Sequence, residues 1–158
     1  MTRYFSDLII RDENGQPLAL VEVKGDLASD RERAAVLRRN VLAHTTAADV
    51  AFFLLLTPSV GYLWKSNPPL DAANSFVRPP DAEFSTSEIL QHYVPGQGNE
   101  ISRVGSVLEL IFYQWLSDLA DGASGRGPGK SKALADVGFL EAVRGAHVIL
   151  EDEFDRVR

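Results

Sequence analysis

Three residues near the start of the chain combine the side chains needed to hold a divalent cation and to place a positive charge beside it. Asp7 begins one apolar run, and Glu22, Val23 and Lys24 end the next one. Carboxylate oxygens are hard ligands that suit Mg²⁺ or Mn²⁺. A lysine beside them would add a positive charge next to the ion. The residue types therefore indicate a candidate catalytic site at Asp7, Glu22 and Lys24.

A β-hairpin is the element that would bring these residues together. Asn14-Gly15 favours the positive φ angles of a tight two-residue turn between two apolar runs. If these residues form the turn, Asp7 lies opposite Glu22, and Lys24 joins them because side chains alternate between the faces. Opposed carboxylates repel each other, so this pairing favours a bound cation.

The remaining elements follow from hydrophobic periodicity and turn signals. The expected order is strands over 5–11 and 18–24, a helix over 31–44 capped by Ser29 or Asp30, strands over 51–57 and 61–65, a short helix from a capping box at 85–88 to 92, and helices over about 100–119 and 132–154. Both faces of the hairpin strands are largely apolar, as in strands covered on both sides. This pattern predicts an α/β (α+β) fold with a central mixed sheet, flanking helices and a C-terminal helical section.

Length and composition favour a single globular domain. The chain has 158 residues and 45% hydrophobic residues, enough for a substantial core. We expect an α/β core over 1–65, a loop or linker with a short helix over 66–98, and C-terminal helices over 99–158 that pack on the core. No apolar run has the length of a membrane span, and no signal peptide is evident. A cytoplasmic protein without a membrane partner is the expectation.

Asp7, the segment Val21-Glu22-Val23-Lys24-Gly25 and the following helix resemble the PD-(D/E)xK nuclease superfamily. The pattern is nearest to the N-terminal nuclease-like domain of type I restriction endonuclease motor subunits, over about residues 4–65. The resemblance implies a restriction-endonuclease-like fold and Mg²⁺-dependent hydrolysis of DNA phosphodiester bonds in a restriction or defence system. It implies that Asp7 and Glu22 hold the metal, that the Val23 carbonyl can join them, and that Lys24 is a catalytic base or an electrostatic stabiliser.

The chain departs from the family pattern in three respects. The family core usually begins with a helix and a strand before the Asp strand, but only six residues precede Asp7. That helix often supplies a further acidic ligand, for which Glu100 or Glu109 could substitute. Many relatives carry Gln or Tyr on the helix after the Lys, where this chain has Arg38, Arg39 and Asn40. The net charge of −6 also disfavours binding of free duplex DNA by the chain alone.

The arginines after the hairpin have two interpretations. Arg31, Arg38 and Arg39 could contact nucleic acid, or they could form an ordinary solvated helix face.

The sequence leads to three functional hypotheses. The first is a metal-dependent deoxyribonuclease, and the second is a catalytically inactive nuclease-fold module that binds nucleic acid, a partner protein or a second copy of itself. The third is an interaction protein in which the Glu-x-Lys spacing is incidental.

Overall fold

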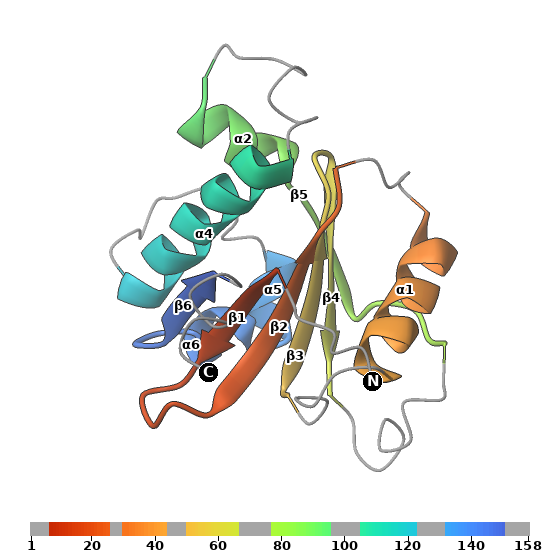
Figure 1. Ribbon diagram of the computed structural model, residues 1–158, viewed down its shortest axis with the longest axis horizontal. Helices are drawn as coiled ribbons and strands as arrows, with labels where there is room; N and C mark the ends of the chain where they lie inside the picture. The colour runs from red at the N-terminus through yellow and green to blue at the C-terminus, as the bar shows by residue number, and fades with distance from the viewer. Residues whose placement is uncertain are drawn as a thin grey trace.

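The computed structural model of the protein describes residues 7–25, 30–43, 50–66, 77–95, 105–122 and 132–150. Over these residues the chain forms a mixed α/β fold around an open, six-stranded sheet in the order β5-β4-β3-β2-β1-β6 (Figure 1). The strands are β1 (Leu8–Arg11), β2 (Pro17–Val23), β3 (Phe52–Leu56), β4 (Val60–Lys65), β5 (Ala82–Ser85) and β6 (His147–Leu150). The helices are α1 (Arg31–Ala43), α2 (Ser87–Tyr93), α4 (Gly105–Asp121), α5 (Lys132–Asp136) and α6 (Phe139–Ala142). The predicted mixed sheet with helical cover is confirmed.

Helices lie on both faces of the sheet, but the two layers differ in size. Figure 1 shows α1 on one face, called here the α1 face, and α4, α5 and α6 on the other, called the α4 face. The core on the α4 face is the larger and includes Phe112 and Trp115 of α4 and Phe139 of α6. The core on the α1 face is smaller and includes Leu42 of α1 and Trp64 of β4.

The hairpin strands are buried from both sides, as their apolar pattern predicts. Ile9 and Leu20 belong to the core of the α1 face, whereas Leu8 and Val21 belong to that of the α4 face. Alternation along β2 therefore directs Glu22 to the α1 face.

The turn of the hairpin is longer than the predicted two residues. Leu8 pairs with Val21 and Ile10 with Ala19, as the predicted register requires, but the register shifts next to Arg11. The loop is organised by Asp12, whose Oδ1 accepts hydrogen bonds from the backbone N–H groups of residues 14 and 16, each at 2.9 Å. An Asx-type loop and a strand irregularity thus replace the tight turn, while the pairing near Asp7 is unchanged.

A crossover through α1 joins β2 to its parallel neighbour β3. Asp30 caps the helix, because its Oδ1 accepts hydrogen bonds from the N–H groups of Glu32 at 2.9 Å and Arg33 at 3.3 Å. This confirms one of the two predicted caps. The crossover places α1 on the same face of the sheet as Glu22.

Two strands were absent from the prediction. The segment expected to be a loop contains β5, which pairs with β4. The expected last helix is wrong from residue 143 to residue 150, and its predicted end at 151–154 lies outside the described residues. Gly138, with a φ of 82°, lies between α5 and α6, and Gly145, with a φ of 78°, lies in the turn after α6. Both φ values are left-handed and interrupt a continuous helix. The chain after Gly145 forms β6, which pairs with β1 at the sheet edge.

The other two predicted helices exist with different details. α4 buries Leu108, Ile111, Trp115 and Leu119 of the predicted stripe. The predicted start of this helix near residue 100 lies outside the described residues. α2 forms without the predicted capping box, since the Thr86 hydroxyl donates to the Thr57 carbonyl instead. None of the helices over the described residues has the length and apolar character of a bilayer span.

Candidate functional site

The β1–β2 register brings Asp7 opposite Glu22. Leu8 pairs with Val21, and Asp7 and Glu22 are the next residues outward on the two strands. Oδ2 of Asp7 accepts a hydrogen bond from the backbone N–H of Val23 at 2.8 Å. This bond ties the start of β1 to β2 and engages one of the two carboxylate oxygens of Asp7.

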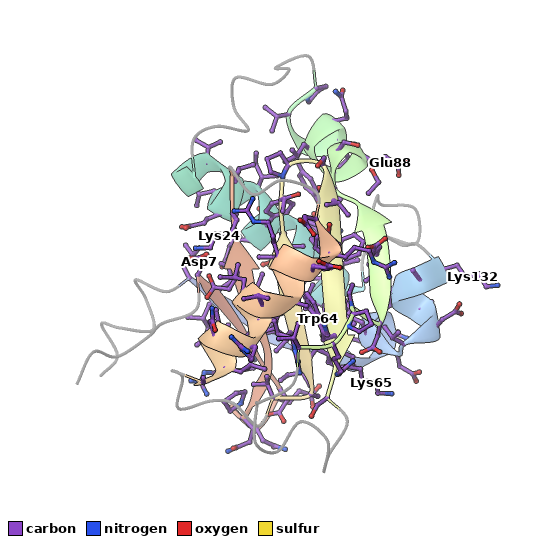
Figure 2. All side chains as sticks on the ribbon, turned by 90° about the vertical axis from the view of Figure 1, so that its right-hand side faces the viewer. Asp7, Lys24, Trp64, Lys65, Glu88 and Lys132 are labelled. Atoms are coloured by element: carbon purple, nitrogen blue, oxygen red, sulfur yellow. The ribbon has the colours of Figure 1, made fainter. Side chains whose placement is uncertain are left out.

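Lys24 lies at the same end of the sheet, directly after β2. Its backbone N–H donates to the carbonyl of Leu56 at 2.9 Å, which continues the pairing of β2 with β3. Asp7 and Lys24 are both half-buried, and Figure 2 shows them at this end of the hairpin. The structure therefore gathers the three predicted catalytic residues around one strand end.

Glu22 is far less accessible than its two neighbours. Only 1% of its surface is exposed, and Leu55, its partner on β3, is fully buried. Burial of a carboxylate without compensating contacts is costly. Glu22 has an interaction partner and is enclosed on the α1 face of the sheet.

A transverse row of side chains runs from Glu22 across the α1 face. Leu55 pairs with Tyr62 on β4, and Tyr62 pairs with Glu83 on the edge strand β5. Burial raises the pKa of Tyr62, and the nearby carboxylates of Glu83 and Asp30 raise it further. The row therefore has a carboxylate at each end, with the side chains of Leu55 and Tyr62 between them.

The three predicted nucleic-acid-binding arginines do not share one surface. Arg38 is 4% exposed and lies with its Cζ 5.8 Å from the centre of the Trp64 ring, so its guanidinium is inside the α1 layer. Arg31 forms a 2.7 Å ion pair with Glu83. Arg39 donates to the Oδ1 of Asn40 at 3.3 Å. Arg38 therefore lies inside the α1 layer and not on a solvated helix face. Contact of the three arginines with nucleic acid stays a prediction.

A further acidic ligand for the site is not found on the predicted helix. Glu109 lies on α4, which packs on the opposite face of the sheet from Glu22, so it is not that ligand. Glu100 lies outside the described residues. Among the residues that are described, no group of three His, Cys, Asp or Glu side chains could hold a metal ion. Asp7 and Glu22 are the two predicted carboxylates that the described structure brings to this strand end.

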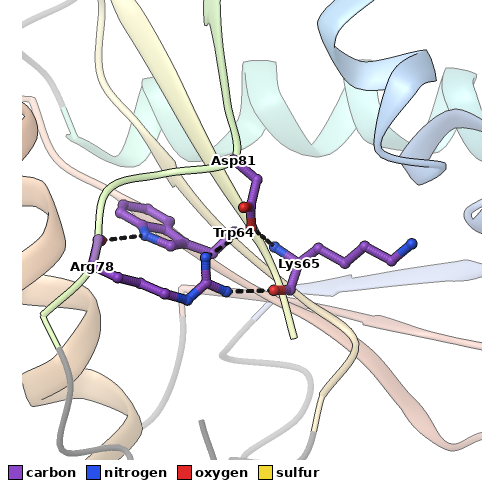
Figure 3. Close-up of polar contacts among 4 residues, drawn as sticks. All are labelled: Trp64, Lys65, Arg78 and Asp81. Atoms are coloured by element: carbon purple, nitrogen blue, oxygen red, sulfur yellow. Dashed lines mark hydrogen bonds and ion pairs between the residues drawn. The ribbon is translucent and has the colours of Figure 1, made fainter. Parts of the chain in front are cut away.

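A polar cluster next to the α1 layer was missed in the sequence (Figure 3). The indole N–H of Trp64 donates to the carbonyl of Arg78 at 3.0 Å, and the Lys65 N–H donates to Oδ2 of Asp81 at 2.7 Å. Arg78 also forms an ion pair with Asp81 at 3.0 Å. These contacts hold the segment before β5 on the end of β4. A buried Trp indole N–H needs a hydrogen-bond acceptor. This need was the one signal in the sequence that another segment packs beside Trp64.

A cavity of about 440 Å³ lies away from the candidate site. It is lined by Leu119, Gly122, Leu140, Glu141 and Arg144, at the C-terminal end of α4 and beside α6. These elements are on the α4 face, whereas Glu22 is on the α1 face. The cavity is therefore not the approach to the carboxylates.

No family model, no curated protein and no solved structure matches this chain. The functional argument therefore depends on the geometry of the strand end and on its chemistry.

Proposed function

We propose that the protein is a metal-dependent nuclease that hydrolyses DNA phosphodiester bonds at Asp7, Glu22 and Lys24. The observation that carries this proposal is the β1–β2 register, which places Asp7 opposite Glu22, with Lys24 two residues further on. Mg²⁺ commonly takes one or two protein carboxylates and completes its coordination with water and substrate phosphate. A two-carboxylate site fits that habit, and Mn²⁺ would suit the same oxygen donors.

Each residue has a distinct part in this proposal. Asp7 and Glu22 hold the ion, and the carbonyl of Val23 is the third candidate ligand. The Val23 N–H orients the Asp7 carboxylate through the 2.8 Å hydrogen bond. Lys24 places a positive charge, or after deprotonation a base, beside the scissile phosphate. When bound, the ion supplies Lewis-acid polarisation of the phosphoryl oxygen and activation of water.

The connectivity of the sheet supports the restriction-endonuclease-like part of the proposal. A hairpin with the acids, a crossover helix and a parallel third strand follow one another as the resemblance requires. The strand that usually precedes the Asp strand has a counterpart in β6, which pairs with the free edge of β1 but comes from the other end of the chain. We infer that late elements complete the sheet here.

Plasmid cleavage tests the enzymatic proposal. The purified full chain should nick supercoiled plasmid in Mg²⁺ or Mn²⁺ and not in excess chelator. Lys24→Met should reduce the rate by about 100-fold or more, since it removes the charge at the reacting phosphate. Lys132→Met is the matched control, because Lys132 is exposed on α5 and distant from Lys24 in Figure 2. Equal cleavage by both variants, or no nicking together with no calorimetric heat of Mn²⁺ binding, would refute the proposal.

A catalytically inactive nuclease-fold module that binds nucleic acid is the second candidate. The observation in its favour is the 1% exposure of Glu22, which shields this carboxylate from an ion in solution. Binding without cleavage should then be weakened by Arg39→Glu. Arg144→Glu is the control, as Arg144 is exposed beside α6. Fluorescence anisotropy with a labelled duplex distinguishes the two candidates, because only the first also shortens the duplex.

A further inference from the structure

Glu22 poses an access problem that the rest of the site does not explain. Its side chain is 1% exposed, and its row neighbours Leu55 and Tyr62 are equally enclosed. Over the described residues, α1 is the helix that lies on this face (Figure 1). Side chains of α1 share a core with Leu20 and Leu55, the neighbours of Glu22 on this face. While this packing holds, Glu22 offers almost no surface to a hydrated ion or a phosphate.

α1 packs on the sheet with few large apolar side chains. Its buried residues are Ala34, Ala35, Arg38, Val41 and Leu42, so two are alanines and one carries a charge. α4, by contrast, buries several large side chains on the opposite face, namely Leu108, Ile111, Phe112, Trp115, Leu116 and Leu119. Elements with little buried apolar area open at a lower free energy than the rest of a fold. α1 is therefore better suited to local opening than α4.

An exposed ion pair ties the first residue of α1 to the sheet edge. Arg31 Nε lies 2.7 Å from Oε1 of Glu83, with side-chain exposures of 61% and 38%. Glu83 belongs to the same transverse row as Glu22, so this contact closes the helix over that row. Exposed ion pairs are weak and are screened by salt. The contact can hold the start of α1 down and still release it.

We propose that α1 is a displaceable cover over Glu22, and that it must lift before a divalent cation or a phosphate reaches this carboxylate. The proposal deepens the proposed function, because it rests on that function for what the opening admits. The movement itself is independent of catalysis. It requires the Arg31–Glu83 contact to break and the small side chains Ala34 and Ala35 to leave the sheet.

Two tryptophans make the movement measurable. Trp64 lies on the α1 face, next to Arg38, and Trp115 belongs to α4 and packs in the core of the α4 face. Each is 1% exposed. Trp115→Phe leaves Trp64 as the reporter of the α1 face, and Trp64→Phe leaves Trp115 as the reporter of the α4 face. Opening of α1 would admit the neutral quencher acrylamide to Trp64 alone.

Glu83→Gln removes the ion pair between Arg31 and Glu83. The matched control is Asp136→Asn, because Asp136 is exposed on α5. We expect Glu83→Gln, or high NaCl, to raise the quenching constant of Trp64 severalfold and to leave that of Trp115 unchanged. Asp136→Asn should change neither. An unchanged Trp64 constant in Glu83→Gln and in salt would overturn the proposal, and so would a parallel rise at both tryptophans, which reports general loosening.

Cross-linking α1 to β5 tests the movement of α1 separately from the proposed function. The chain has no cysteine, so Arg31→Cys with Glu83→Cys gives a single pair for a short bismaleimide. The tethered protein should lose Mn²⁺ binding in calorimetry and show the lowest Trp64 quenching. The untethered double variant should bind Mn²⁺ and show higher Trp64 quenching. Retained Mn²⁺ affinity after tethering would contradict a cover. Absence of Mn²⁺ binding in the unmodified protein would instead refute the proposed function, while quenching would still decide whether α1 moves.

Discussion

At the residue scale, the Asp7 carboxylate makes two contributions that can be separated. It accepts a hydrogen bond, and it carries a negative charge. Its Oδ2 accepts the Val23 N–H at 2.8 Å in a half-buried position. Asp7→Asn keeps an acceptor oxygen and removes the charge, so the free energy of unfolding should change little while Mn²⁺ binding is lost. Asp7→Ala should also cost about 1–2 kcal/mol of stability, because the N–H loses its partner. Urea unfolding and calorimetry measure the two effects, and equal stability losses in both variants would contradict the separation.

Tyr93 should make the protein sensitive to alkali. Burial raises the pKa of its hydroxyl, and the hydrogen bond to Oδ2 of Asp118 raises it further. The folded state then holds the phenolic proton more strongly than the unfolded state. Its contribution is complete below about pH 10, the ordinary tyrosine pKa, and declines as the pH rises beyond it. Melting temperatures between about pH 9 and pH 11 should fall less steeply in Tyr93→Phe than in the unmodified protein.

At the scale of elements, Gly61 allows β4 and β5 to approach. A Cβ on Gly61 would lie 2.3 Å from Cζ of Phe84, whose ring packs 5.7 Å from that of Trp115. Gly61→Ala should cost about 1–3 kcal/mol of stability through this overlap. Phe84→Leu in the same chain should recover part of the loss. Gly15→Ala is the control: φ is +80° and nothing lies within 4 Å, so only backbone strain of about 1–2 kcal/mol is expected. Additive losses at Gly61 and Phe84 would contradict the steric explanation.

Local signals in the sequence predicted the elements near the site and failed where distant segments pair. The faces of the hairpin, the crossover helix and its Asp30 cap follow from alternation and capping chemistry. β5 and β6 are four-residue strands stabilised by β4 and β1, partners that a local pattern does not reveal. The enclosure of Glu22 was also hidden, because it depends on how α1 seats on the sheet. The opposition of Asp7 and Glu22 could be predicted, and their unequal access could not.

For the whole molecule, the two ends of the chain meet in one sheet. β6 pairs with β1 from Leu8 to Arg11, so late residues cover the edge of the strand that follows Asp7. Val148 and Leu150 of β6 pack against the core of the α4 face. The Asp7 strand is therefore an interior strand only in the presence of β6.

Truncation tests this dependence on β6. A chain that ends at Ala146 lacks β6, and a control chain that ends at Leu150 keeps it. The shorter chain should melt at a lower temperature and associate as its concentration rises, because β1 becomes an open edge next to apolar side chains. Thermal unfolding and light scattering measure the two effects. The control should remain close to the full chain in both, and identical behaviour of the two truncated chains would show that β6 contributes nothing to the sheet. If the shorter chain does lose Mn²⁺ binding along with β6, the strand that carries Asp7 is held in place from the far end of the sequence.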